Sequence, residues 1–159
     1  MEKILISACL YGHAVRYDGQ DNLINHPQLE TWKAQGRLVV LCPEVSGGLP
    51  TPRPPAECQP NGQVISIVGD DCTAAFQAGA QQAVELCRQH HIKLALLKEN
   101  SPSCGSHFIY DGQFSGTKIP GQGLTAAALK DNDIQVFSEH QIDELTAALS
   151  TLEALNPRN

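Results

Sequence analysis

The chain has 159 residues, of which 42% are hydrophobic and 18% are charged. This length and composition predict a single domain, residues 1–159, which can bury its own apolar core without disulfides. A formal net charge of -6 and the lack of any tract of clustered Lys and Arg argue against nucleic acid as a partner. No apolar stretch has the length of a signal-sequence core or a membrane span, so we expect a cytoplasmic protein that acts on a small molecule.

Strand and helix patterns alternate along the whole chain. Residues 3–8, 37–42 and 92–98 are apolar runs without polar alternation, which is typical of strands covered on both faces. In chain order, we expect strand 3–8, helix 25–36, strand 37–42, a short edge strand or hairpin half at 62–69, helix 70–90, strand 92–98, a loop at 99–123 that carries an Asp-Gly hairpin signal, helix 123–132, strand 134–137 and helix 141–155.

Local signals mark where the first two helices begin. Asn25 is the candidate N-cap of the first helix, with Pro27 in its first turn and Gly36 after its end. Asp70 or Asp71 can cap the second helix. Both helices would therefore cross from one strand to the next, as the connections of a parallel sheet do.

The alternation of strands and helices predicts the fold class. Such chains form βαβ units with right-handed crossovers. We expect an α/β fold, specifically a single-domain Rossmann-like three-layer sandwich with a mainly parallel sheet and helices on both faces. Ligands of these sheets bind outside the carboxyl ends of the strands. Cys9, Cys42 and Cys104 lie where three of the predicted strands end, so the three thiols would meet at that edge.

This trio of cysteines has two interpretations. One cysteine at a strand end is easily explained as a small buried side chain, but three at equivalent positions indicate a shared metal or cluster site. Inert or redox-active thiols are the alternative. Thiolates without a companion His favour a soft centre, either iron–sulfur or zinc, and three protein ligands leave a position open for substrate. His13 and His107 lie in adjoining loops, where a solvated side chain is the commoner outcome.

The other three cysteines have different settings. Cys87 lies on the apolar face of helix 70–90 and is expected to fill the core. Cys72 lies in the first turn of that helix, where a structural role is also the better expectation. Cys58 lies in a Pro/Gly-rich stretch and is a candidate fourth ligand.

Polar groups with proton or anion chemistry surround the trio. Glu44, two residues after Cys42, is a general base if it is partly desolvated and a solvated loop carboxylate if it is not. Ser101 and Ser103 can orient a substrate or a water, although Ser in turns usually bonds its own backbone. Arg53 can bind an anion or lie in solvent. The backbone N–H groups that begin helix 123–132 offer donors for a substrate oxygen.

Five motifs carry a family resemblance. In order along the chain they are "SACLYGHAVRYDG", "CPEVSGGLPTPRPPAE", "VGDDCTAAFQAGA", "LLKENSPSCGSHFIYDGQFSG" and "GQGLTAAAL". Together they resemble the thiouracil desulfurase family, formerly a domain-of-unknown-function family, from Cys9 to about Glu139.

The resemblance implies a non-redox desulfidase with a 4Fe-4S cluster held by Cys9, Cys42 and Cys104. The fourth iron of the cluster would be free to act as a Lewis acid toward the thiocarbonyl sulfur of 2-thiouracil. Water would attack the ring carbon, giving uracil and hydrogen sulfide. By the same resemblance, Glu44 would handle the proton of the attacking water, and Ser101 would position substrate or shuttle protons.

Two other functions compete with this interpretation. The first is a non-catalytic iron–sulfur protein that senses redox state or stores a cluster, in which Cys58 would complete the ligand set. The second is a zinc hydrolase with a three-thiolate site.

Overall fold

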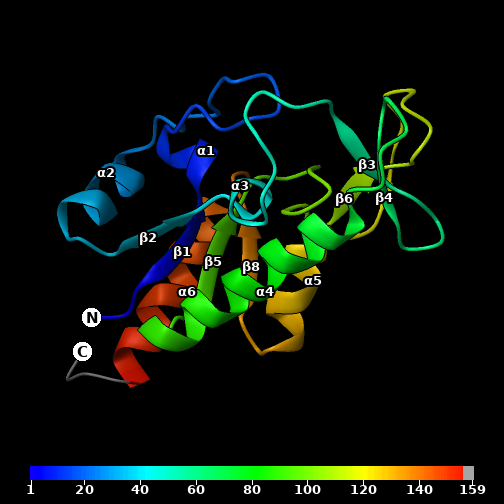
Figure 1. The fold of residues 1–159 in the computed structure, drawn as a ribbon. Coiled ribbons are helices and arrows are strands. Elements are labelled where there is room, and N and C mark those ends of the chain that lie inside the picture. The colour runs from blue at the N-terminus through cyan, green and yellow to red at the C-terminus, as the bar shows by residue number, and fades with distance from the viewer. Residues whose placement is uncertain (156–159) are drawn as a thin grey trace.

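Four parallel strands form the central sheet of the computed structural model, which describes residues 1–155 (Figure 1). The strands lie in the order β2-β1-β5-β8. Their bounds are Ile4–Ser7 for β1, Leu38–Leu41 for β2, Leu94–Leu97 for β5 and Gln135–Ser138 for β8. The all-parallel pairing confirms the predicted sheet.

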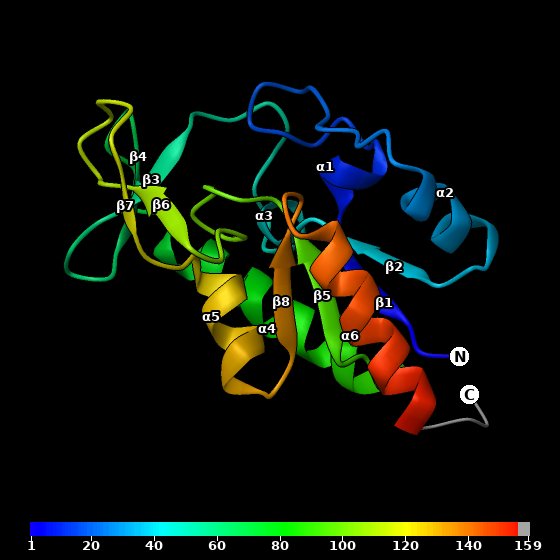
Figure 2. The same ribbon diagram turned by 180° about the vertical axis from the view of Figure 1, so that it is seen from behind.

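Helices cover both faces of this sheet, as Figures 1 and 2 show from opposite sides. Helices α4 (Thr73–His90) and α5 (Leu124–Asp131) pack on one face. Helices α2 (Pro27–Ala34) and α6 (Ile142–Leu155) pack on the other. The three-layer α/β prediction is confirmed.

Alternation along the strands divides the core between the two faces. In β1, Leu5 packs with the cluster under α4 and α5, while Ile4 and Ile6 pack with the cluster under α2 and α6. Leu94 and Leu96 of β5 join the second cluster in the same way. Full burial of each such side chain stabilises the fold by roughly 1.5–3 kcal/mol. This two-sided burial explains why the strand sequences are continuously apolar.

Helix starts differ from the predicted caps by one residue. The N-cap of α2 is His26 rather than Asn25, and the His26 Nδ1 atom accepts a hydrogen bond from the Gln28 N–H at 3.0 Å. Because Pro27 occupies the first helical position, the residue before it becomes the cap. At α4, Cys72 takes the N-cap position, and Asp71 accepts from the Thr73 N–H at 2.9 Å.

Two hairpins extend from the side of the sheet. Strands β3 (Ala56–Cys58) and β4 (Val64–Ser66) pair antiparallel, which confirms the hairpin alternative for residues 62–69. Strands β6 (Phe108–Tyr110) and β7 (Lys118–Pro120) form the second hairpin, and residues 111–117 connect them. The Asp-Gly signal therefore marks a hairpin, but one with a long connection.

Two short helices follow the first two strands and complete the carboxyl edge of the sheet. Helix α1 (Ala8–Tyr11) follows β1, and α3 (Pro43–Ser46) follows β2. Helix α3 lies unusually close to α4, because a Cβ atom on Gly79 would collide with the Pro43 carbonyl group. The glycine therefore sets the position of the segment that begins at Cys42. Within residues 1–155, no helix is both long and apolar enough to cross a membrane.

Candidate active site

The three cysteines of the predicted trio lie at the carboxyl edge of the sheet. Cys9 lies in α1 directly after β1, Cys42 takes the N-cap position of α3 directly after β2, and Cys104 lies in the loop after β5. The chain runs outward from β1 to β2 and then returns past β1 to β5. The sheet therefore has its switch point at β1 and β5, where α/β folds bind their ligands.

The three sulfur atoms share one neighbourhood, because Ser7 at the end of β1 pairs with Leu41 of β2 and its Oγ donates to Cys104 Sγ at 3.3 Å. Burial raises the pKa of Cys104 to about 12, hydrogen bonds from Ser7 and Ser103 oppose this, and the charges of Cys9 and Cys42 raise it further. Burial likewise raises the pKa of Cys9, with a further increase from the charge of Cys42. Such coupling requires proximity because charge interactions weaken with distance. The structure thus brings together the trio that the strand pattern predicts.

The donor set suits a soft metal centre such as an iron–sulfur cluster. Thiolates are soft ligands, and metal binding would displace the protons that the raised pKa values keep on the sulfurs. Within the described part of the chain, no three His, Cys, Asp or Glu side chains converge on one point that could hold a metal ion. Each thiolate of a cluster binds a different iron, so a cluster does not require such convergence. Ser7 Oγ donates to Cys104 Sγ at 3.3 Å, a contact that would tune a bound cluster.

Helix α5 holds the loop that carries Cys104. The N–H groups of Leu124 and Thr125 donate to the carbonyls of Pro102 and Ser103, at 3.0 and 2.9 Å. The expectation that this helix start offers its N–H groups to a substrate oxygen was wrong, because the cysteine loop already occupies them. A helix N-terminus stabilises these carbonyl oxygens as it does other negative charge.

A buried carboxylate, that of Glu99, closes the same loop from the other side. Glu99 is 7% exposed, and its Oε2 accepts from the Ser106 hydroxyl at 3.0 Å. Burial alone would raise the pKa of Glu99, but backbone N–H donors outweigh it and lower the pKa to about 2. Those donors to Oε1 are the N–H groups of Ser106 at 2.8 Å, His107 at 3.1 Å, and Asn100 and Phe108 at 3.3 Å. The ionised carboxylate therefore fixes the backbone on both sides of Cys104.

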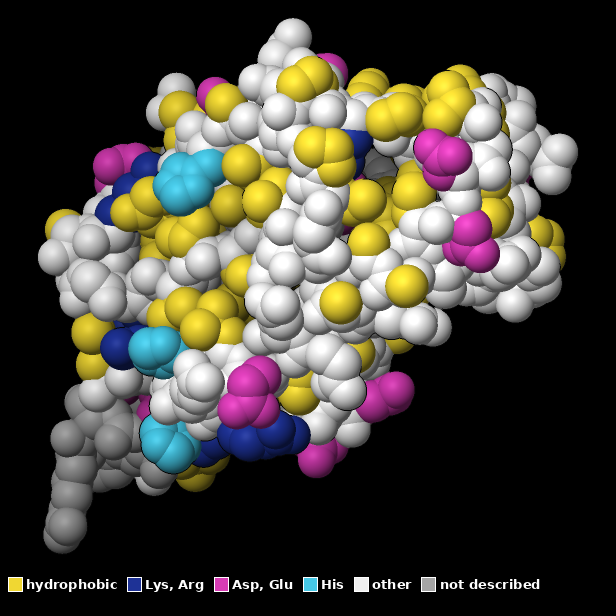
Figure 3. Space-filling model, viewed as in Figure 1, with side chains coloured by type: hydrophobic (Ala, Val, Ile, Leu, Met, Phe, Trp, Pro, Cys, Tyr) yellow, Lys and Arg dark blue, Asp and Glu magenta, His cyan; other side chains and the backbone are white. Residues whose placement is uncertain are grey.

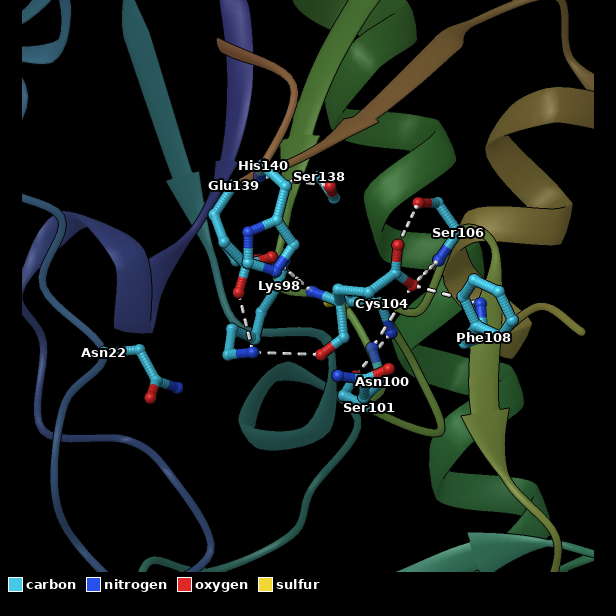
Figure 4. A network of polar contacts seen from close by, with 12 residues as sticks. Asn22, Lys98, Asn100, Ser101, Cys104, Ser106, Phe108, Ser138, Glu139 and His140 are labelled. Atoms are coloured by element: carbon cyan, nitrogen blue, oxygen red, sulfur yellow. Dashed lines mark hydrogen bonds and ion pairs between the residues drawn. The ribbon is translucent and has the colours of Figure 1, made fainter. Parts of the chain in front are cut away.

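A cation lies beside the first cysteine. Lys98 Nζ pairs with Glu139 Oε2 at 2.7 Å, and Glu139 Oε1 accepts from the Glu99 N–H at 2.8 Å (Figure 4). Burial raises the pKa of Cys9, while a hydrogen bond with Asn22 and the charge of Lys98 lower it in part. Neither Asn22 nor Lys98 stood out in the sequence, since only the fold places them near Cys9.

Glu44 is held between an arginine and a serine. The Arg53 Nε and Nη2 atoms both lie 3.1 Å from Glu44 Oε1, and the side chains of Arg53 and Glu44 are only 6% and 15% exposed. Ser103 Oγ donates to Glu44 Oε2 at 2.8 Å. The alternative of a solvated Glu44 is therefore wrong, and so is the alternative of a solvent-exposed Arg53.

The two candidate serines take different positions. Ser101 Oγ accepts from the Cys104 N–H at 2.7 Å and from the Ser103 N–H at 3.2 Å. Ser103 Oγ lies 3.1 Å from Ser101 Oγ and contacts Glu44 directly. A continuous polar chain therefore runs from Arg53 through Glu44 and Ser103 to Ser101.

Comparison with known proteins decides the family. The model of the 2-thiouracil desulfurase family matches residues 4–141. This chain belongs to the 2-thiouracil desulfurase family. Among solved structures it is similar to a [4Fe-4S]-dependent thiouracil desulfidase, TudS, with 53% sequence identity, a TM-score of 0.93, and coverage of 95% of this chain and 99% of that chain. It is also 37% identical over 154 residues to the uncharacterized protein YbbK of Bacillus subtilis (strain 168), covering 89% of this chain and 99% of YbbK.

The remaining cysteines of this 2-thiouracil desulfurase family member lie outside the trio. Cys87 is 1% exposed in the core under α4, as predicted. Cys72 is half-buried at the start of α4, where its thiol donates to the Asp70 carbonyl at 3.7 Å. Cys58 comes nearest to the site, because its thiol donates to the Pro102 carbonyl at 3.5 Å. Burial raises the pKa of Cys58 to about 11, with a contribution from the nearby charge of Glu44.

Proposed function

We propose that this chain is an iron–sulfur-dependent desulfidase that converts a thiocarbonyl heterocycle, such as 2-thiouracil, to uracil and hydrogen sulfide. The observation that carries the proposal is the meeting of Cys9, Cys42 and Cys104 beside Glu44, in a chain 53% identical to a [4Fe-4S]-dependent thiouracil desulfidase. The sheet edge where they meet is the usual ligand-binding edge of this fold.

The three cysteines would hold three irons of a 4Fe-4S cluster. When bound, the cluster would supply one open iron as a Lewis acid for the thiocarbonyl group. Ser7, through its hydrogen bond to Cys104 Sγ, belongs to the groups that orient and tune this ligand. The loop contacts of Glu99 and of helix α5 keep Cys104 in place before cluster binding.

Glu44 accepts a proton from the water that attacks the ring carbon. The pairing with Arg53 fixes the carboxylate, and this pre-organised geometry is what a general base requires. The oxygen of water bonds to the ring carbon, the carbon–sulfur bond breaks, and both water protons leave with sulfur as hydrogen sulfide. The reaction is thus a hydrolysis that needs no external oxidant or reductant.

Ser103 and Ser101 extend the proton path from Glu44. The Ser103 hydroxyl is within hydrogen-bonding distance of both Glu44 Oε2 and Ser101 Oγ, at 2.8 and 3.1 Å. Ser101 then positions substrate or passes protons onward, with Ser103 as its link to the carboxylate. Ser103 Oγ also contacts Cys104 Sγ at 3.6 Å, which joins the path to the proposed cluster ligands.

One observation favours a second candidate function. Cys58 contacts the Pro102 carbonyl in the segment that leads to Cys104. If its thiolate bound the fourth iron, the cluster would be fully ligated, as in a redox sensor or a cluster-storage protein. The closeness of Glu44 favours the desulfidase, because a storage site needs no general base.

The proposal is tested by anaerobic reconstitution followed by assays of iron, acid-labile sulfide and sulfide release from 2-thiouracil. We expect close to four irons per chain, with uracil and sulfide formed in equal amounts. A fully loaded protein that releases no sulfide from a panel of thiopyrimidines would overturn it. The Cys87→Ala variant serves as a control, since Cys87 lies in the core under α4.

A further inference from the structure

Lys98 lies between the segments that carry two of the proposed cluster ligands. It follows β5 directly at the carboxyl edge of the sheet, and its backbone N–H donates to Ser7 Oγ at 3.0 Å. Ser7 ends β1 two residues before Cys9, and the same Oγ donates to Cys104 Sγ at 3.3 Å. The contacts of Ser7 therefore fix the Lys98 backbone close to both cysteines.

The Lys98 side chain is held by two contacts of its ammonium group. Its Nζ atom pairs with Glu139 Oε2 at 2.7 Å and donates to the Glu99 carbonyl at 3.1 Å. The Lys98 and Glu139 side chains are only 28% and 14% exposed. An ammonium group has three N–H donors, so one is left for a further contact. Figure 4 shows the Lys98 head group on the side of the network that faces Asn22.

The charge of Lys98 and the amide of Asn22 both act on Cys9. Burial raises the pKa of the Cys9 thiol, and the hydrogen bond with Asn22 and the charge of Lys98 oppose this increase. Asn22 is itself oriented, because its Oδ1 atom accepts from Arg16 Nη1 at 3.1 Å and its N–H groups are left for the sulfur. A nearby cation and an N–H donor each stabilise a thiolate.

Arg53, a second cation near the trio, is committed to other groups. It donates to four partners, which are Glu44, Thr51 Oγ1 and the carbonyls of Val15 and Pro50. Arg53 therefore offsets mainly the charge of Glu44. Three thiolates bring further negative charge to the same edge of the sheet, and Lys98 is the cation placed beside one of them.

We propose that Lys98 is a positioning residue that balances the negative charge of the cysteine site through Cys9, an inference that rests on the proposed cluster site. The reduction potential of an iron–sulfur centre depends on the charges and hydrogen bonds around its sulfurs. A nearby cation favours the addition of an electron and so raises this potential. Because the proposed hydrolysis involves no net electron transfer, the same cation acts there on the charge of the departing sulfur.

The test compares the reduction potential of the reconstituted centre in three variants, by redox titration followed by EPR. Lys98→Met removes the charge but keeps a side chain of similar length, and Lys98→Arg keeps the charge. Glu139→Gln removes the carboxylate that offsets Lys98. The amide oxygen of this last variant can still accept from the Glu99 N–H, as Glu139 Oε1 does at 2.8 Å. Iron content and sulfide release from 2-thiouracil are measured on the same samples.

Lys93→Met is the matched control, because Lys93 is an exposed lysine at the amino end of the same strand. At about 3.3 Å per residue, β5 places the two lysines roughly 17 Å apart. This exceeds the Debye length of about 8 Å at physiological ionic strength, so the charge of Lys93 is screened from the site. Lys93 lines a surface hollow with Arg88 and His91, and Figure 3 shows Lys, Arg and His side chains near the lower end of that face.

We expect Lys98→Met to lower the potential, Lys98→Arg and the control to keep it near the parental value, and Glu139→Gln to raise it. Opposite shifts from the two partners of one ion pair identify charge as the cause, since loss of a structural contact would affect both variants alike. Unchanged potentials, or shifts of the same sign, would overturn the inference even in a protein that releases sulfide.

Two further outcomes separate this inference from the proposed function. If Lys98→Met assembles no cluster, Glu139→Gln decides, and a potential at or below the parental value in that variant overturns the inference. The expected opposite shifts in a protein that releases no sulfide would support the role of Lys98 and reject only the desulfidase function. A parent protein that assembles no cluster would overturn both.

Discussion

Ser103 Oγ donates a hydrogen bond to Glu44 Oε2 at 2.8 Å, which joins the loop of Cys104 to the helix that begins after Cys42. This contact thus links two segments that are far apart in the sequence, next to two proposed cluster ligands. The same contact links the proposed ligand site to the proposed base. Substitution of Ser103 or Glu44 therefore tests catalysis while the proposed cluster ligands stay unchanged.

Glu44→Gln is expected to lower kcat for sulfide release by about 10²–10⁴, because the amide cannot accept the proton of the attacking water. Iron content should stay at the parental value, since Glu44 is not among the proposed ligands. The measurement is sulfide release at saturating 2-thiouracil, normalised to iron. Glu85→Gln is the matched control, because Glu85 is an exposed residue of α4 that pairs with Arg88 on the same helix. A parental kcat in Glu44→Gln would remove Glu44 from the mechanism.

Ser101→Ala and Ser103→Ala should differ in their effects on stability. Removal of Ser101 Oγ leaves the N–H groups of Cys104 and Ser103 without their acceptor, at a cost of about 1–3 kcal/mol in the free energy of unfolding. Removal of Ser103 Oγ breaks the contact with Glu44 and should mainly lower kcat. Urea unfolding and iron-normalised kcat would distinguish the two. Equal losses of stability would contradict the assigned roles.

Cys104→Ser should abolish cluster assembly and activity, because a hydroxyl is a poor ligand for a soft iron site. Cys58→Ala, in contrast, should keep the iron content and the sulfide-release activity. Iron, acid-labile sulfide and the visible absorbance of the reconstituted variants measure both outcomes. Retention of the cluster in Cys104→Ser would show that Cys104 is not a ligand. Loss of the cluster in Cys58→Ala would instead support the fully ligated sensor or storage protein.

Glu99→Gln should destabilise the apo-protein at neutral pH. The folded pKa of Glu99, about 2, lies below its usual value of 4.5, so the stabilisation is present above about pH 4.5 and is lost as the pH falls through 2. This lowering of the Glu99 pKa corresponds to about 3 kcal/mol in the free energy of unfolding at pH 7. Urea unfolding of the parent and the variant at pH 7 and pH 3 should show a difference that shrinks on acidification. Glu144→Gln, a change of an exposed residue, serves as the control. If parent and Glu99→Gln differ in stability by the same amount at both pH values, ionisation of Glu99 is not the cause of the difference.

The sequence predicts the residues of the site that lie at the ends of strands. Apolar runs predict the parallel strands, and the sheet then places Cys9, Cys42 and Cys104 on one edge. Contacts between distant segments leave no local pattern, and the pairing of Glu44 with Arg53 depends on how a loop folds back. The role of helix α5 was mispredicted for the same reason, because only the fold shows that the cysteine loop supplies the acceptors for its N–H groups.

Gly79→Ala tests whether helix packing positions the second cysteine. A Cβ atom at residue 79 would collide with the Pro43 carbonyl, so α3 must move away from α4 and take Cys42 and Glu44 with it. Overpacking of this kind costs about 1–3 kcal/mol in the free energy of unfolding, and we expect lower iron occupancy as well. Gln81→Ala, an exposed change on the same helix, is the control for helix propensity. Because alanine favours a helix interior over glycine by about 1 kcal/mol, a stabilised variant with full iron occupancy would show that α3 can shift without disturbing the site.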